Sequence, residues 1–187
     1  MRMIQRKGTP VTYIDVTVDK DSGEITMIND GDGIDIEKHP EHDIWIPELV
    51  FANLRTSTNY DKEEKRIGGG RNGIGSKICF IWSIYGYVEV VDTTRGLKYT
   101  QTFKNNMDDV GKPKVTSCKS KKAYTKISFI PDYRRLGFAD GKLTAEMEAI
   151  FHRRVIDISA VTGRSVKVKY NGAARSEEHT SELQSPC

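Results

Sequence analysis

The sequence has few cysteines and no long apolar run, and both shortages exclude whole classes of protein. Only three cysteines occur in 187 residues, and none has the Cys-x-x-Cys spacing of a zinc or redox site, nor do they form a disulfide framework. The longest apolar stretch, residues 78–91, is broken by Ser83, Gly86 and Glu89 and is too short to cross a bilayer. The first residues lack the apolar centre of a signal peptide. We therefore expect a cytosolic or nuclear protein.

An excess of charge of one sign is also missing. The 29 Lys and Arg residues nearly balance the 26 Asp and Glu residues, and the net charge of +3 is too mild to indicate a nucleic-acid-binding surface by itself. Residues 175–187 resemble a translated sequencing adapter, and we expect them to lie outside the fold as an artefact; a genuine polar tail is the alternative. Without that segment, which holds one Arg and three Glu, the net charge is +5.

Periodicity predicts an α+β layered domain. Residues 11–18 alternate between apolar and polar, a turn follows at residues 19–23, and residues 24–28 form the returning strand of a hairpin. Further strands are expected at residues 87–91, 97–103, 126–130 and 165–170, and helices at residues 46–54, 76–84 and 144–162. The last helix carries one apolar stripe, made of Met147, Ile150, Phe151, Val155, Ile158 and Val161.

Two glycine clusters are the strongest candidates for a functional site. The first, Asn29-x-Gly31-x-Gly33-Ile34, follows a predicted strand, and the second, residues 68–77, precedes a predicted helix. Glycines let backbone N–H groups approach an anion closely, and a helix start adds partial positive charge. The second cluster is not a P-loop, because Lys77 follows Ser76 instead of preceding a Ser or Thr. When the second cluster is considered alone, a flexible hinge is an alternative interpretation of its glycines.

Taken together, the two clusters and the segment between them carry a specific resemblance. The sequence has Asn29-x-Gly31-x-Gly33-Ile34, then Thr-Ser-Thr-Asn-Tyr-Asp at residues 56–61, then Gly-Gly-Arg-Asn-Gly-Ile-Gly-Ser-Lys at residues 69–77. This order and spacing resemble the ATPase domain of the Bergerat-fold (GHKL) superfamily and, within it, type IIA DNA topoisomerases of the eukaryotic or viral kind. The resemblance covers most of residues 11–174. It implies a two-layer sandwich, with a mixed, mostly antiparallel sheet and helices on one face.

The resemblance also implies a role for each matching residue. Asn29 is expected to recognise adenine, because its amide can both accept from and donate to the base. The other expected ATP contacts are the base-side glycines Gly31 and Gly33; the ribose and phosphate contacts Ser57, Thr58 and Asn59; the lid residues Arg71, Asn72, Gly73, Ile74, Gly75 and Lys77; and Ser128, which stands where the family usually has Thr.

The sequence departs from the family before the first strand. There the family has a helix with a Glu that activates water and an Asn that binds Mg²⁺, whereas residues 1–10 contain neither residue type. The resemblance therefore implies that the general base, the Mg²⁺ ligand and the DNA-cleaving Tyr lie outside this chain. We expect a domain incomplete at its N-terminus, with residues 1–10 as a remnant, that does not hydrolyse ATP by itself. No residue of the chain is expected to be catalytic or to bind metal.

The implied parent is an ATP-dependent DNA topoisomerase that passes one duplex through another, with ATP, Mg²⁺, DNA and a second identical subunit as partners. It would act in the nucleus, or in the cytoplasm or virion if the source is a large DNA virus. The main alternative is a non-catalytic GHKL clamp of the chromatin-remodelling type; chaperone-type ATPases lack the element at residues 56–61. For His39 and His42, Pro40 and the lack of a third ligand favour a solvated loop over a metal site.

Overall fold

The computed structural model describes residues 9–53 and 74–174, and these form one mixed sheet with helices. The strands are β1 (Tyr13–Val18), β2 (Ile25–Asp30), β3 (Ser83–Asp92), β4 (Leu97–Lys104), β5 (Asp109–Val110), β6 (Lys114–Ser117), β7 (Tyr124–Pro131), β8 (Lys167–Tyr170) and β9 (Ala173–Ala174). The helices are α2 (Ile46–Ala52), α3 (Gly75–Ile81) and α4 (Ala145–Thr162), with a 3₁₀ turn at Asn105–Met107.

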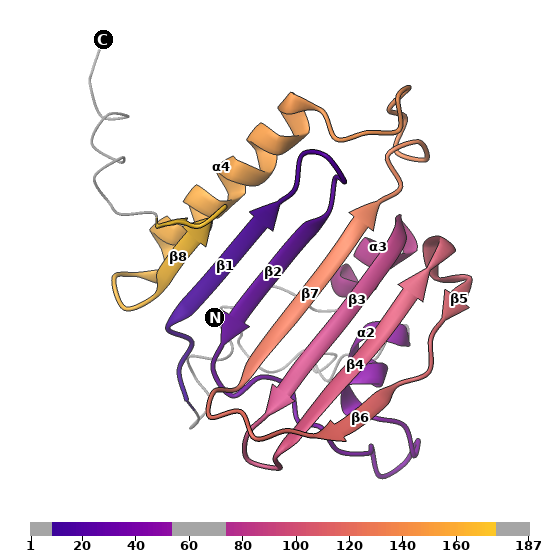
Figure 1. Cartoon of the computed structure of the whole chain (residues 1–187), viewed down its shortest axis with the longest axis vertical. Coiled ribbons are helices and arrows are strands. Elements are labelled where there is room, and N and C mark those ends of the chain that lie inside the picture. Colours follow the sequence, from indigo (N-terminus) through magenta and orange to yellow (C-terminus); the bar gives the residue numbers. More distant parts are fainter. Residues whose placement is uncertain (1–8, 54–73, 175–187) are drawn as a thin grey trace, which may run out of the picture.

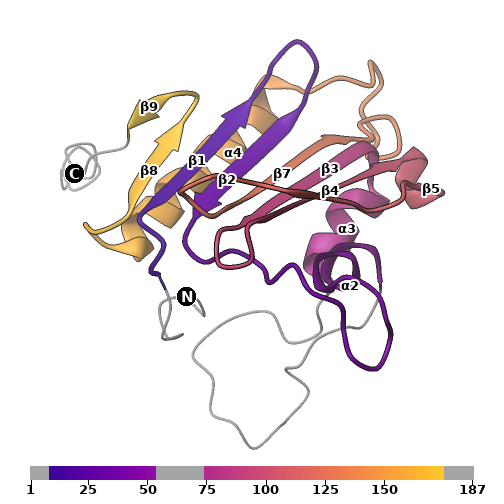
Figure 2. The ribbon, with the colours of Figure 1, turned by 60° about the horizontal axis from the view of Figure 1, so that its bottom comes forward.

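The strands follow the order β5-β4-β3-β7-β2-β1-β8-β9, with β6 added beside β4 (Figure 1). Every pair is antiparallel except β1 with β8, which run parallel with Tyr13 opposite Lys167. In Figure 2 the three helices lie on the same side of the sheet. The predicted two-layer α+β class, with a mixed and mostly antiparallel sheet, is confirmed.

Alternation along the strands separates a helix face from an open face. Val16, Val18 and Ile25 pack with Val155 of α4, while Val88 and Val90 pack with Phe51 of α2 and Phe80 of α3. Phe129 contacts both clusters, which joins them into one layer of apolar side chains. Because successive strand residues point to opposite faces, every second residue of β2, starting from Ile25, lies on the helix face. We call this side the helix face and the other side the open face.

The helix α3 approaches the sheet closely at Gly86 in β3. A Cβ added to Gly86 would lie 2.8 Å from Cε1 of Phe80 and closer still to Cδ1 of the same ring. Phe80 stacks on Phe103 with ring centroids 4.6 Å apart and meets Phe51 edge-on at 6.1 Å. The ring therefore fills the space that a side chain at position 86 would need, and this contact fixes the height of α3 above the sheet.

Two local predictions are wrong. The helix expected over residues 76–84 ends at Ile81, because Ser83 already pairs with Pro131 of β7 and the backbone carbonyl of Trp82 accepts from Asp132 N–H at 2.8 Å. In α4, the predicted apolar stripe is buried only in part: Val155 is buried, but Ile150 and Val161 are 54% and 77% exposed. The sheet side of α4 is narrower than the sequence pattern indicated.

Two further expectations concern the first and last residues of the chain, which are predicted to lie outside the folded domain. Residues 1–8 and 175–187, which include most of the predicted remnant and all of the predicted adapter segment, lie outside the described residues. Among the helices that the structure describes, none combines the length and the apolar character needed to span a membrane.

Candidate functional site

The site is built around Asn29, the next-to-last residue of β2. Asn29 lies on the helix face, since it has the same strand parity as Ile25, and it stands opposite Thr125 of β7. Its Nδ2 donates to the backbone carbonyl of Asp30 at 2.9 Å. Its Oδ1 has no hydrogen-bond partner among the described residues. The amide therefore presents an oxygen acceptor beside the buried Thr125 hydroxyl, which likewise has no partner in the described part of the chain.

The first glycine cluster covers this end of the sheet. Gly31 and Gly33 are buried and have φ values of +99° and +70°, in the region that side chains disfavour. A Cβ on Gly33 would lie 3.6 Å from Oγ1 of Thr125 and 3.7 Å from the backbone oxygen of Val91. The chain thus crosses directly above the ends of β7 and β3, which places both glycines next to Asn29 and Thr125.

An ion cluster fixes the segment that follows these glycines. Arg95, in the β3–β4 turn, contacts Asp35 at 3.0 Å, Glu37 at 2.7 Å and Asp92 at 2.9 Å. Asp92 also accepts from the backbone N–H groups of Ile36 and Arg95, at 3.2 and 3.0 Å. Burial by itself would raise the pKa of Asp92, but these hydrogen bonds and the guanidinium outweigh it and hold the pKa below its ordinary value. The glycine segment is therefore anchored to the sheet on its far side.

The second glycine cluster is described from Ile74 onward. The Ile74 carbonyl accepts from the N–H groups of Lys77 and Ile78 at 3.0 Å each, and this begins α3. A Cβ on Gly75 would meet nothing within 4 Å, and its φ does not require glycine, so the fold of the described residues does not explain why glycine stands there. Lys77 is buried, with 2% of its surface exposed, and desolvation lowers its pKa.

The first glycine cluster and residues 74–77 of the second therefore lie on the helix side of the sheet. Lys77 precedes Phe80 by about one helical turn, and Phe80 covers the row of paired residues that contains Gly86 and Phe129. That row lies four strand positions from the row of Asn29 and Thr125, which is about 13 Å along the strands. The other predicted contacts, which are Ser57, Thr58, Asn59, Arg71, Asn72 and Gly73, lie outside the described residues.

The structure does not bring Ser128 to this group. Its hydroxyl lies 2.7 Å from Oγ1 of Thr26, and Thr26 occupies the open face, since Ile25 next to it is in the core under α4. Ser128 is buried by its neighbours on that face. The hydroxyl on the helix face is that of Thr125, three residues earlier, which the sequence reasoning missed.

A cavity between described residues also lies on the open face and is not part of the Asn29 group. Its volume is about 690 Å³, and Asp30 lines it while Asn29 does not. The full lining is Thr12, Tyr13, Ile28, Asp30, Glu89, Lys122, Ala123, Tyr124, Lys126 and Lys167. The Asp30 carboxylate accepts from the backbone N–H groups of Thr12 and Tyr13 at 2.7 and 2.8 Å, so it has a structural role at the start of β1.

Comparison with known proteins gives the context of this geometry. No protein-family model matches the chain. The chain is 44% identical over 158 residues to DNA topoisomerase 2 of Acanthamoeba polyphaga mimivirus, covering 84% of this chain and 12% of that protein. It is 45% identical over 159 residues to DNA topoisomerase 2 of Candida glabrata, covering 85% of this chain and 11% of that protein.

Solved structures similar to this chain are also of topoisomerase II. The ATPase region of Saccharomyces cerevisiae topoisomerase II bound to ICRF-187 superposes with a TM-score of 0.82 at 41% identity, covering 88% of this chain and 43% of that one. Over most of its length the chain is homologous to the ATPase region of topoisomerase II. The ATPase and transducer domains of Balamuthia mandrillaris DNA topoisomerase II give a TM-score of 0.84 at 34% identity, covering 93% of this chain and 45% of that one.

The predicted resemblance to a type IIA topoisomerase GHKL domain is thus confirmed, and the alternative of a chromatin-remodelling clamp is not favoured. The chain corresponds to part of the topoisomerase II ATPase region. It spans about a tenth of the length of the curated relatives that it matches, and less than half of the ATPase-region structures.

Proposed function

We propose that this chain binds ATP on the helix face as part of the ATP-operated gate of a DNA topoisomerase. The observation that carries the proposal is the Oδ1 of Asn29, which has no partner within residues 9–53 and 74–174 and is held beside the Thr125 hydroxyl under Gly31 and Gly33. The similarity to topoisomerase II ATPase regions, which covers 88% and 93% of this chain, supports it.

In this proposal Asn29 and Thr125 read the base. The Oδ1 of Asn29 accepts a hydrogen bond from the exocyclic amino group of adenine, while its Nδ2 remains on the Asp30 carbonyl. The Thr125 hydroxyl contacts the same edge of the base, directly or through a water. Gly31 and Gly33 bring backbone to the base plane without a Cβ between them.

The second glycine cluster would hold the phosphates. The span of about 13 Å between the Asn29 row and the row under Phe80 suits a nucleoside triphosphate lying along the strands. Lys77 would supply a cation to the phosphates, and Gly75 would leave its backbone open to a phosphate oxygen. Ile74 and the undescribed residues Ser57, Thr58, Asn59, Arg71, Asn72 and Gly73 would complete the lid and the ribose contacts.

The described residues do not fit a protein-held Mg²⁺ site. Mg²⁺ prefers carboxylate and phosphate oxygens. Near Asn29, however, Asp30 is bound to Thr12 and Tyr13, and Asp92 is bound to Arg95. We therefore assign no Mg²⁺ ligand to the described part of the chain.

DNA and a second copy of the full-length subunit are proposed as further partners of the parent protein. The proposed location is the nucleus, or the cytoplasm or virion for a viral source. These assignments depend on the relatives, which are named DNA topoisomerase 2 and come from a virus and from eukaryotes.

Calorimetric titration with the β,γ-imido analogue of ATP tests the proposal. We expect binding to the chain, and a GTP analogue that binds at least about tenfold more weakly, because its O6 would face the Asn29 oxygen as a second acceptor. Thr125→Val keeps the shape of the side chain but removes the hydroxyl, and it should weaken binding of the ATP analogue about fivefold, equivalent to a hydrogen bond of about 1 kcal/mol.

Ser128→Ala is the matched control, since it removes a hydroxyl from the same strand on the open face. It should leave the affinity unchanged. Equal affinity for the two nucleotides, or a larger loss in Ser128→Ala than in Thr125→Val, would contradict the placement of the base at Asn29.

A further inference from the structure

A short loop between β2 and α2 is closed by backbone hydrogen bonds. Lys38 and Trp45 form an isolated antiparallel bridge, and within it His39 N–H donates to the Ile44 carbonyl at 2.8 Å. Asp43 N–H donates to the His39 carbonyl at 3.0 Å, and Asp43 takes a φ of +52° to make this turn. The residues between 39 and 43 are therefore held in a defined frame and do not form an open-ended coil.

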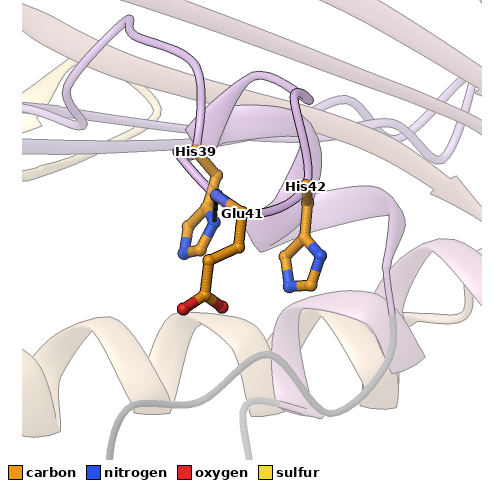
Figure 3. A group of neighbouring side chains, drawn as sticks. All are labelled: His39, Glu41 and His42. Atoms are coloured by element: carbon orange, nitrogen blue, oxygen red, sulfur yellow. Dashed lines mark hydrogen bonds between the residues drawn. The ribbon is translucent and has the colours of Figure 1, made fainter.

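Three metal-binding side chains project from the same side of this loop (Figure 3). They are His39, Glu41 and His42, whose potential ligand atoms all lie within 4.8 Å of one another. The two imidazole rings are stacked, with centroids 4.8 Å apart and planes inclined by 21°. Sequence reasoning counted only the two histidines, and the fold adds Glu41 as the third ligand that it lacked.

One contact of the loop must open when a cation binds. The backbone N–H of Glu41 donates to Nδ1 of His39 at 3.3 Å, so the lone pair of the neutral ring is on Nδ1 and its proton is on Nε2. A cation can take the Nδ1 lone pair in place of this long hydrogen bond, or bind Nε2 once the proton has moved to Nδ1. The fourth polar side chain of the loop, Asp43, is occupied by Lys38 at 2.8 Å. The same ion pair keeps the ammonium of Lys38 engaged away from the histidines.

We propose that His39, Glu41 and His42 bind a divalent transition-metal ion of the zinc type. Two imidazole nitrogens and one carboxylate form a set that Zn²⁺ takes with water as a fourth ligand. Hard cations such as Mg²⁺ and Ca²⁺ prefer all-oxygen sites, which this loop does not offer. Tetrahedral ligands at about 2.0–2.1 Å from zinc are about 3.4 Å apart, so the side chains must close by at most about 1.4 Å.

That adjustment falls within the freedom of these side chains. Glu41 and His42 are exposed and His39 is half-buried, so rotations about their side-chain bonds displace no core residue. The site is separate from the proposed nucleotide site, because it uses none of the residues that surround Asn29. The metal-site proposal and the nucleotide-site proposal can therefore be tested and refuted independently.

Imidazole NMR of the full 187-residue chain during titration with ZnCl₂ tests the site. The signals of His39 and His42 should move together and saturate at one equivalent, whereas those of His152 and His179 serve as internal references. Zinc bound by cysteine thiols would leave both loop imidazoles unshifted, and that result would overturn the proposal.

Substitutions in the loop sharpen the test. His42→Ala and Glu41→Gln should each lower the affinity for Zn²⁺ at least about tenfold, since even the loss of an outer hydrogen-bond partner costs about 10–100-fold at metal sites. Asp43→Asn removes a carboxylate from the same loop that is not a ligand, and its affinity should stay within about twofold of the unsubstituted chain by the same comparison. An equal loss in Asp43→Asn, or none in Glu41→Gln, would refute the three-ligand geometry.

Discussion

Replacing Gly86 by alanine tests the packing that holds α3 on the sheet. The added methyl would lie 2.8 Å from Cε1 of Phe80, whereas carbon atoms prefer about 3.5–4.0 Å, so the ring must retreat by about 1 Å. It has little room to do so, because Phe103 is stacked on it and Phe51 meets its edge. Overpacking of this kind costs about 1–3 kcal/mol, and the rigid surroundings place the cost near the upper end.

Part of that cost is offset in the backbone. Alanine in a strand is favoured over glycine by about 0.5–1 kcal/mol, so we expect Gly86→Ala to lower the free energy of unfolding by about 2 kcal/mol. Urea unfolding followed by circular dichroism should show the midpoint falling by about 1 M, given typical slopes of about 1–3 kcal/mol per molar urea.

Two further variants make this measurement decisive. Gly75→Ala, where the methyl meets nothing, should leave the midpoint unchanged or raise it slightly. Phe80→Leu should cost less in the Gly86→Ala background than alone, because the smaller side chain relieves the crowding. A Gly86→Ala midpoint equal to that of the unsubstituted chain would show that α3 is not held by this contact.

Three other perturbations follow from named contacts. The pKa of Asp92 lies below its ordinary value of 3.8, so its carboxylate stabilises the fold above that pH and stops doing so as the pH falls through the lower folded value. In Asp92→Asn the free energy of unfolding should therefore fall less steeply with decreasing pH below about pH 4 than in the unsubstituted chain. Tyr133 donates to the Gly23 carbonyl at 2.8 Å, and burial raises the pKa of its phenol to about 12. Tyr133→Phe should therefore lower the free energy of unfolding by about 1–2 kcal/mol in urea unfolding. The fall in stability that ionisation of this phenol causes in the unsubstituted chain between pH 10 and 12 should be absent from the variant. Thr144→Ala removes the acceptor for Met147 N–H at the start of α4 and should lower stability by about 1 kcal/mol by the same assay.

The sheet and the first glycine segment could be predicted because their signals are local. The hairpin of β1 and β2 follows from the alternation around Val16 and from the turn residues between the strands. Asn29 is predicted as a site residue because it opens a glycine motif that resembles the family's, and both glycines of that motif take a positive φ. These features depend on a few adjacent residues, which a single sequence displays directly.

The choice between Ser128 and Thr125 required strand parity as well as residue type. Ile127 packs on the helix face, so Ser128 faces the other way, and Thr125 shares the parity of Ile127. The alternation of apolar and polar residues along β7 carries this information. The third ligand of the histidine loop could not be predicted in the same way, because it depends on how the loop closes between Lys38 and Trp45.

The parallel pairing of β1 with β8 was beyond prediction, since its partners lie about 150 residues apart and no local pattern connects them. It has a consequence for how the molecule is made. During synthesis β1 emerges about 150 residues before β8 and pairs with β2 on one side. Its pairing on the other side waits until β8 and the Asn171 side chain, which accepts from Val18 N–H, leave the ribosome. Closing so long a loop is slow, and an unpaired strand edge invites aggregation, so a nascent chain stalled before residue 167 is a natural substrate for chaperones.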